Sequence, residues 1–311
     1  MATQGLWLVS ISAVIAVLLF DLIWAVLHRD KATSLKEAAA WTLFYVSAAL
    51  IFGFTMQNWG SAQSSQEFLA GWITEYSLSI DNLFVFIIIL ARLQIAKEKE
   101  QLVLLFGITL ALVFRGIFIA IGAAVIERFV AIFFLFGAIL LYTAWALIKE
   151  SPGSHEWKEG KLLTALRKRG YSNFTLALVA LGMTDLIFAL DSIPAIFGLT
   201  KDPYIVFMAN AFALMGLRQL YFLVGILLKR LVYLSKGLAI ILGYISIKLF
   251  IEALHGVGVH EIAGIHFEKP PLNISLGIII GTLIITSAIS LMKQPNPTDR
   301  KSTRLNSSHR T

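Results

Sequence analysis

The sequence predicts an all-α polytopic membrane protein with about nine transmembrane helices, including two inverted three-helix repeats. Three observations lead to this fold class: an apolar composition, a series of long hydrophobic segments and two matching charged motifs. Of the 311 residues, 58% are apolar and only 14% are charged. A soluble domain is nearer half apolar and about a quarter charged. The chain has no cysteine, which excludes a disulfide framework and thiolate metal ligands.

Nine hydrophobic segments approach or exceed the roughly 20 residues that a helix needs to cross a bilayer. The predicted spans are 6–27, 38–57, 66–91, 101–125, 129–148, 174–199, 204–228, 237–255 and 272–292. The first of these is not a signal peptide, because no basic residue precedes it and it carries Asp21.

The lysines and arginines predict the orientation of these spans. They gather in alternate loops, and the segment 149–173 alone holds six of them. Because basic loops stay on the cytoplasmic side, we expect a multi-pass protein of the bacterial inner membrane with its N-terminus outside and its C-terminus inside. The net charge of +7 is then a topology signal and does not indicate a nucleic-acid partner.

The spans and loops predict the organisation of the chain. The parts are two N-terminal spans (1–65), a first repeat (66–148), a cytoplasmic loop with a short amphipathic piece (149–173), a second repeat (174–255), an outer loop with the last span (256–292), and a tail (293–311). The tail is polar and rich in Pro and Ser, which predicts disorder, and its end resembles translated vector sequence.

Eight charged residues lie deep inside the predicted spans, and Glu252 lies near an outer end. The eight are the acids Asp21, Glu75, Asp81, Asp185 and Asp191 and the bases Arg115, Arg218 and Lys248. Each charge at a bilayer centre costs about 2.5–3.5 kcal/mol on insertion scales, so the set indicates function. The surplus of two negative charges matches one divalent cation. Structural ion pairing is the alternative for any single residue, and Asp21 is either a metal ligand on the cytoplasmic side or the partner of a base.

Two of these spans carry the same motif. "TEYSLSIDN" in span 66–91 and "TDLIFALDS" in span 174–199 both read Thr, acid, five residues, Asp and a small polar residue. The next span in each case carries one arginine, Arg115 or Arg218, and the span after that places Tyr142 opposite Lys248. The two motif spans run in opposite directions, which is typical of secondary transporters with a site near the membrane midplane.

The segments "EYSLSIDNLFVF" and "ALDSIPAIFGLT" resemble the TerC family, which is named for tellurium resistance and includes the Alx-type proteins. The resemblance implies a LysE-like transporter that exports manganese(II). It also implies a metal path lined by Glu75, Asp81, Asn82, Asp185, Asp191 and Ser192. A plastid branch of the family is associated with inserting membrane proteins, so a scaffold or insertion factor linked to metal or tellurite stress is the second hypothesis. Nothing in these residues indicates tellurite as the substrate.

The chemistry of the motif residues also favours a hard cation. Carboxylate, amide and hydroxyl oxygens suit Mg²⁺, Ca²⁺ and Mn²⁺. We therefore expect Mn²⁺ as a transported substrate and no tightly bound cofactor. Arg115 and Arg218 are expected to pair with the carboxylates when the metal is absent, with Lys248 and Asp21 as further gating or counter-ion groups. Proton exchange is expected because an emptied buried carboxylate takes up a proton readily.

The positions of the acids along their helices predict their relative depths in the membrane. At 1.5 Å per residue, Glu75 should be level with Asp191, and Asp81 with Asp185.

An intramembrane aspartyl protease uses a pair of aspartates, but the "GMTD" sequence departs from the glycine–Asp pattern of such proteases, so we expect no enzyme.

Three histidines lie near the outer end of span 237–255: His255, His260 and His266. They are either an exit site for metal or solvated loop residues.

Overall fold

The computed structural model describes residues 3–27, 34–149, 160–227, 233–262, 265–266, 268 and 270–292. The helices are α1 (Gln4–Leu27), α2 (Leu35–Trp59), α3 (Ala62–Arg92), α4 (Lys97–Arg128), α5 (Ile132–Lys149), α6 (Lys161–Lys168), α7 (Asn173–Phe197), α8 (Pro203–Leu227), α9 (Leu234–Gly256) and α10 (Leu272–Met292). Two short strands, β1 (Glu261–Ile262) and β2 (Ile265–His266), pair antiparallel between α9 and α10. The predicted disordered tail, 293–311, lies outside the described residues.

Nine helices in the described part of the chain are long and apolar enough to cross a membrane. This confirms the predicted fold class, and the helix ends lie within a few residues of the predicted spans. The two longest helices, α3 and α4, have 31 and 32 residues, well above the roughly 20 that a span requires. The short helix α6 is the amphipathic piece expected between the repeats, because Leu163 is buried while most of its other residues are exposed.

Serine side chains mark the start of three of the long helices. Ser34, Ser61 and Ser172 precede α2, α3 and α7, and each hydroxyl accepts a hydrogen bond from the backbone N–H three residues further on. Such caps satisfy amides that have no partner within the helix. Two of the three caps therefore fix the first turn of α3 and α7, the helices that carry the two matching motifs.

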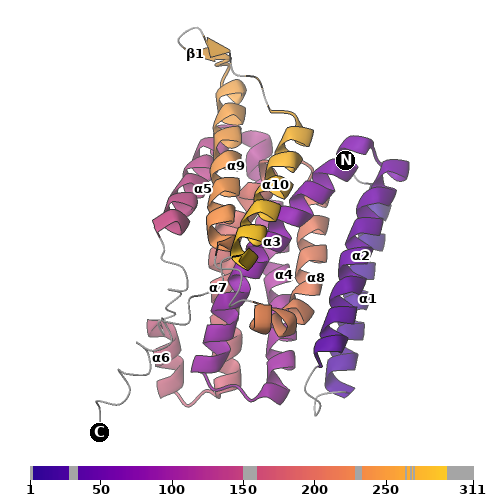
Figure 1. Cartoon of the computed structure of the whole chain (residues 1–311), viewed down its shortest axis with the longest axis vertical. Helices are drawn as coiled ribbons and strands as arrows, with labels where there is room; N and C mark the ends of the chain where they lie inside the picture. The colour runs from indigo at the N-terminus through magenta and orange to yellow at the C-terminus, as the bar shows by residue number, and fades with distance from the viewer. Residues whose placement is uncertain are drawn as a thin grey trace.

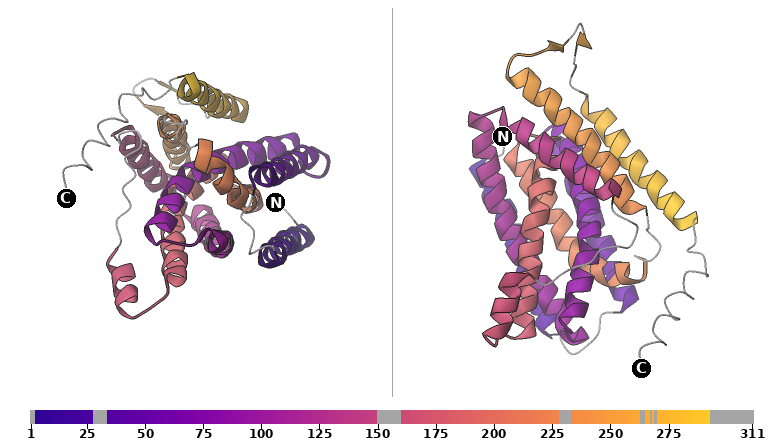
Figure 2. Two further views of the ribbon diagram at one scale, coloured as in Figure 1. Left: turned by 60° about the horizontal axis from the view of Figure 1, so that its bottom comes forward. Right: turned by 90° about the vertical axis from the view of Figure 1, so that its left-hand side faces the viewer.

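The two ends of the helical bundle carry different connections. The start of α1 and strand β1 lie at one end, and α6 lies at the other (Figure 1). Helices α9 and α10 pack side by side and are inclined to the steeper helices of the bundle (Figure 2). The outer loop and the 149–173 segment were predicted to face opposite sides of the membrane, and β1 and α6 lie at opposite ends as that prediction requires.

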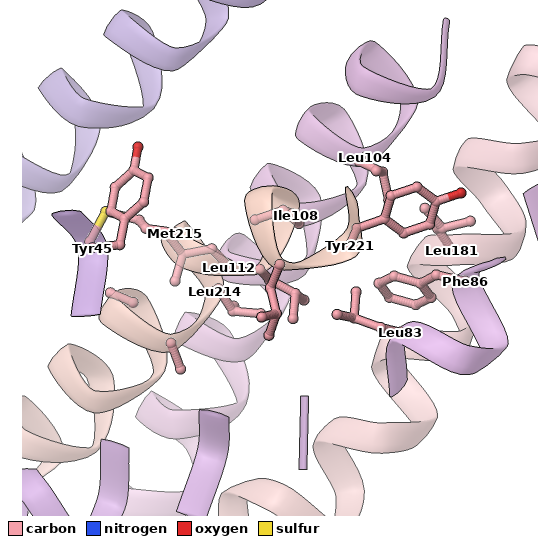
Figure 3. Packing of buried hydrophobic residues seen from close by; sticks show 14 of the residues in the cluster. Tyr45, Leu83, Phe86, Leu104, Ile108, Leu112, Leu181, Leu214, Met215 and Tyr221 are labelled. Atoms are coloured by element: carbon pink, nitrogen blue, oxygen red, sulfur yellow. The ribbon is translucent and has the colours of Figure 1, made fainter. Parts of the chain in front are cut away.

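The buried apolar side chains form two clusters. The larger cluster joins α2, α3, α4, α7 and α8, and Leu83, Phe86, Leu104 and Tyr221 pack together within it (Figure 3). The smaller cluster is built mainly on α7 and α9, with contributions from α3, α4, α5, α8 and α10. Many large apolar side chains on the outside of the bundle are exposed, as expected for a surface that faces lipid rather than water.

The helix packing follows a pattern that the two predicted repeats would produce. If α3, α4 and α5 correspond to α7, α8 and α9, then the contacts α3–α8 and α4–α7 are equivalent, and so are α5–α7 and α3–α9. All four contacts are present. The inverted repeat itself stays a prediction, but helices of one predicted repeat pack mainly against helices of the other.

Candidate functional site

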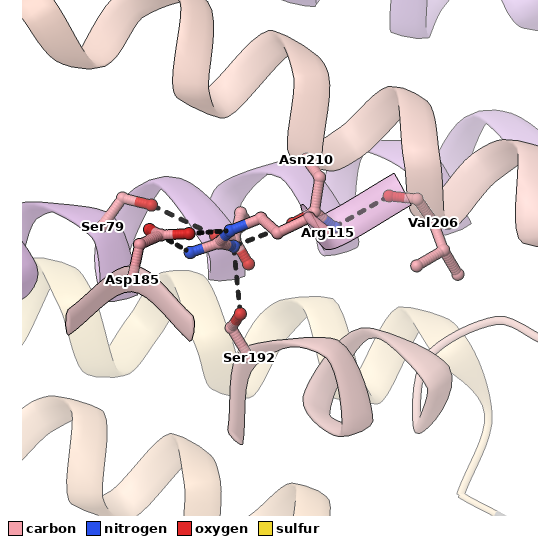
Figure 4. Close-up of polar contacts among 7 residues, drawn as sticks. Ser79, Arg115, Asp185, Ser192, Val206 and Asn210 are labelled. Carbon is pink, nitrogen blue, oxygen red and sulfur yellow. Dashed lines mark hydrogen bonds and ion pairs between the residues drawn. The ribbon is translucent and has the colours of Figure 1, made fainter. Parts of the chain in front are cut away.

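Arg115 of α4 is the central polar residue of the bundle, and its side chain is 0% exposed. The guanidinium holds Asp185 of α7 in a two-point contact, with Nε donating to Oδ2 at 3.1 Å and Nη2 donating to Oδ1 at 3.0 Å. Figure 4 shows this pair at the centre of a group of polar side chains. Bidentate arginine–carboxylate bonds are among the stronger hydrogen bonds in proteins, so this contact fixes α4 against α7.

The third nitrogen of the guanidinium contacts three further side chains. Arg115 Nη1 donates to Oε1 of Glu75 on α3, to Oγ of Ser192 on α7 at 3.0 Å, and to Oδ1 of Asn210 on α8 at 2.9 Å. Glu75 Oε1 also accepts a hydrogen bond from Ser79 at 3.2 Å. Four helices, α3, α4, α7 and α8, therefore meet at one cation.

Asn210 is oriented by its own helix. Its Nδ2 donates to the carbonyl of Val206 at 2.9 Å, which leaves Oδ1 directed at Arg115 (Figure 4). A buried amide without partners would cost free energy. Here both ends of the amide have partners, so Asn210 presents a preorganised oxygen to the centre of the bundle.

Three of the six predicted metal-path residues bind Arg115 directly: Glu75, Asp185 and Ser192. Asp191 is close enough to Glu75 and Arg115 to interact electrostatically with both. Asn82 is buried on α3. The backbone of Asp81 belongs to α3, but its side chain lies outside the described part of the structure.

The predicted depths of the acids in the membrane account for only part of the contacts around Arg115. Regular-helix geometry pairs Glu75 with Asp191, and these two like charges are close enough to interact electrostatically. The same geometry leaves Glu75 and Asp185 on different levels, whereas one guanidinium joins them. The long side chain of Arg115 bridges the offset, and this bridge was not anticipated. The predicted pairing of Asp81 with Asp185 is not tested, because only one of the two side chains is described.

Sequence analysis also missed Ser79 and Asn210. Most small polar residues of α3 bond to their own helix, as Thr74 does to Ala70 and Ser77 does to Ile73. Ser79 had no feature that set it apart from them. Asn210 had a usable signal, because an amide in the middle of the apolar segment "VFMANAFALMG" needs a partner within the membrane.

The second arginine has a different partner. Arg218 Nη2 of α8 donates to Oδ1 of Asp21 on α1 at 3.0 Å, and the hydroxyl of Tyr45 on α2 hydrogen-bonds to the same carboxylate. Asp21 and Arg218 are 2% and 3% exposed. Of the two hypotheses for Asp21, the structure confirms the partner of a base.

A polar cavity of about 340 Å³ lies at the end of the bundle where α7 leads into α8. Its lining includes Glu67, Thr200, Lys201, Lys248 and Glu252. Thr200 donates to Glu67 at 2.5 Å, and Lys201 forms an ion pair with Glu252. Lys248 interacts electrostatically with both Glu67 and Glu252, so it is the counter-ion of this cavity.

Two of the three predicted histidines lie together beyond that cavity. The ring centroids of His255 and His260 are 4.9 Å apart, and His255 Nδ1 lies 2.8 Å from the carbonyl of Ile251. The side chain of His266 lies outside the described residues. Across the described residues, no group of three or more His, Asp or Glu side chains is arranged to hold a metal ion.

These features define a class of protein: a polytopic integral membrane protein with a charged centre buried between its helices. The sequence profile of the integral membrane protein TerC family matches residues 60–298. The chain belongs to this family. Helices α1 and α2 precede the matched region.

Similar proteins are found in several bacteria. The uncharacterized membrane protein Rv2723 of Mycobacterium tuberculosis is 39% identical, over 93% of this chain and 80% of its own length. The uncharacterized membrane protein STKORF319 of Myxococcus xanthus is 34% identical, over 94% and 93%. The putative membrane-bound redox modulator Alx of Escherichia coli K12 is 33% identical, over 90% and 92%. No solved structure shows significant similarity to the chain.

Proposed function

We propose that this protein is a secondary transporter that exports a divalent metal ion, Mn²⁺, from the cytoplasm by alternating access. The observation that carries the proposal is the position of Arg115, a fully buried cation held by Glu75 of one predicted repeat and Asp185 of the other. In transporters built from inverted repeats, the substrate site lies at this repeat interface. The protein's own cation occupies the place where the substrate cation would bind.

The groups around Arg115 suit a hard metal ion. Each side-chain atom that accepts a bond from the guanidinium is an oxygen, from carboxylates, a hydroxyl or an amide. Carboxylate and carbonyl oxygens suit Mn²⁺, Mg²⁺ and Ca²⁺. Because Arg115 fills the space between Glu75 and Asp185, the guanidinium and the metal ion are alternative occupants. In this proposal the metal-bound arrangement is a second state, in which Arg115 has withdrawn and Asp191 joins the other two acids.

The cost of burying these charges also favours a functional role. Removing ions from water costs several kcal/mol per ion even after the protein relaxes, and well-packed apolar side chains often stabilise a core at least as well. Asp191 adds a third acid to the two that Arg115 holds. A purely structural pair would need no such excess of acid, whereas a divalent cation requires it. Proton counter-transport is part of the proposal, since acids that release a metal ion inside a membrane gain protons readily.

The polar cavity where α7 leads into α8 fits the exit of this pathway. With the N-terminus outside, as the basic loops predict, the cavity lined by Glu67, Lys248 and Glu252 faces the outer side of a bacterial inner membrane. Lys248 would then be a gating cation at the exit, in the way that Arg115 is at the centre. Acids on the walls would attract the departing metal ion, and the ammonium groups would limit its return.

The name of the Alx relative refers to redox modulation. This chain has no cysteine, so a redox role would not use its own thiols or disulfides. A scaffold or insertion factor remains the competing hypothesis, and it gives no reason for a buried cation between matched acids.

The proposal is tested by measuring total cellular metals under a manganese load. Cells that produce the protein should hold several-fold less manganese than vector cells, with other metals unchanged. Cells that produce Glu75→Gln at the same membrane level should match the vector cells. Unchanged manganese together with altered insertion of other membrane proteins would instead favour the scaffold.

A further inference from the structure

Arg218 occupies the place in the second predicted repeat that Arg115 occupies in the first. Both arginines are almost fully buried, and each lies one helix after a matching acidic motif. Their partners differ, because Arg115 binds Glu75 and Asp185 whereas Arg218 binds Asp21 of α1. The two equivalent cations are therefore in two different states within one structure.

Two buried polar atoms near these arginines have no hydrogen-bond partner within the described residues. One is Oε2 of Glu75, an acceptor, and the other is Nε of Arg218, a donor. Leaving such a group unpaired costs about 1–3 kcal/mol, and more for a charged group. The interior of the bundle thus contains an unused acceptor and an unused donor of complementary chemistry.

Helices α3 and α8 pack closely near these two residues. A Cβ atom placed on Gly216 of α8 would lie 3.5 Å from a ring carbon of Tyr76, the residue that follows Glu75 on α3. Gly216 is two residues before Arg218, and α3 packs along α8. A shift of α8 on α3, together with a change in the long side chain of Arg218, would therefore direct its guanidinium toward Glu75.

The predicted repeat also defines the contact that Arg218 would make. Arg115 uses Nε and Nη2 to hold Asp185, the motif acid of the other repeat. If the two repeats exchanged roles, Arg218 would hold Glu75, the motif acid of the first repeat, through its Nε and Nη2. In the structure, Nη2 of Arg218 donates a hydrogen bond to Asp21. Nε of Arg218 and Oε2 of Glu75 have no hydrogen-bond partner within the described residues.

We infer that Arg218 is a second, exchangeable counter-cation of the central site, and that Asp21 is the positioning residue that holds it away while Arg115 is in place. The inference rests on the proposed transport function and deepens it. The two arginines alternate at the carboxylates as the repeats exchange conformations, and the metal ion binds when neither is present. Tyr45 supports Asp21 through its hydroxyl, so α1 and α2, which precede the family-matched region, supply the holding group.

The test is Mn²⁺ binding by titration calorimetry on the purified full chain in detergent, with thermal unfolding recorded for each variant. In Asp21→Asn, Arg218 loses its anion and competes for Glu75, so the apparent affinity for Mn²⁺ should fall by roughly 5–150-fold, the usual range of coupling between sites. Tyr45→Phe should shift the affinity in the same direction by less. The double variant Asp21→Asn/Arg218→Gln should bind Mn²⁺ more tightly than Asp21→Asn, because the competing cation is gone.

The control is Glu37→Gln, which removes a carboxylate in the first turn of α2 and should leave binding unchanged. A merely structural Asp21–Arg218 pair would lower the unfolding temperature of Asp21→Asn without changing the affinity of the folded protein. That outcome, or a double variant that binds no better than Asp21→Asn, would overturn the inference. Wild-type protein that binds no Mn²⁺ would overturn the proposed function as well, so the two failures are distinguishable.

Discussion

Both carboxylate oxygens of Asp185 accept a hydrogen bond from Arg115, from Nε at 3.1 Å and from Nη2 at 3.0 Å. This planar, two-point contact joins α4 of the first predicted repeat to α7 of the second. A lysine ammonium carries the same charge but has no fork of donors. The contact therefore requires the shape of the arginine as well as its charge.

Replacing Arg115 by lysine should lower the rate of manganese export at least tenfold, because the ammonium keeps the charge but loses one of the two bonds to Asp185. Export is measured as manganese efflux from preloaded cells with equal amounts of protein in the membrane. Arg128→Lys, at the exposed end of the same helix, is the matched control and should export normally. Normal export by Arg115→Lys would show that charge alone suffices.

Replacing Asn210 by alanine should lower the free energy of unfolding by about 1.5–3 kcal/mol, the usual contribution of a hydrogen bond to a charged group. The reason is that Arg115 Nη1 loses an acceptor at 2.9 Å. Chemical unfolding in detergent measures the change. Asn58→Ala, at an exposed position near the end of α2, should change stability by less than about 0.5 kcal/mol. Equal stabilities of the two variants would show that the oxygen of Asn210 does not stabilise the centre.

Much of this centre could be predicted from the sequence, because a charge in an apolar span stands out. Glu75, Asp185 and Arg115 were identified in this way, and so was Ser192 through its motif. The spans were predicted for a similar reason, since a bilayer sets a minimum length of apolar helix.

The sequence predicts that the arginines pair with carboxylates, but it does not predict which carboxylates each arginine holds. Regular-helix arithmetic places Cα atoms, whereas a guanidinium at the end of a long side chain joins acids on different levels. The helices that follow one another in the chain are also not the closest neighbours here. Arg115 of α4 contacts α7 and α8, and this follows from packing between the repeats, which no local pattern records.

Close packing of α9 on α10 gives a prediction about the fold. A Cβ atom on Gly237 would lie 2.7 Å from Oγ1 of Thr286, so Gly237→Ala should destabilise the protein by about 1–3 kcal/mol, as overpacking usually does. Gly243 lies on the same helix, and a Cβ there would meet no described atom within 4 Å. Gly243→Ala should be neutral or stabilising by about 0.5–1 kcal/mol, through helix propensity. Thermal unfolding in detergent compares the two, and the reverse order would contradict the packing of α9 on α10.

The predicted topology is tested by labelling single cysteines, and the cysteine-free chain needs no background substitutions. Val257 and Thr164 are exposed and lie at the end of α9 and in α6. A membrane-impermeant thiol reagent added to intact spheroplasts should label Val257→Cys and not Thr164→Cys, and both should react after the membrane is opened. Labelling of both positions in intact spheroplasts would contradict the inverted orientation of the two repeats.

The central claim is that the carboxylates shared by Arg115 bind a transported metal ion. The most direct measurement is Mn²⁺ flux into vesicles that contain the purified protein and a trapped fluorescent Mn²⁺ indicator, for the wild type and for Glu75→Gln, Asp185→Asn and Glu37→Gln. We predict flux for the wild type and Glu37→Gln, and none above protein-free vesicles for the other two, although all four proteins insert equally. Wild-type rates for Glu75→Gln and Asp185→Asn, or no flux for the wild type, would contradict the claim.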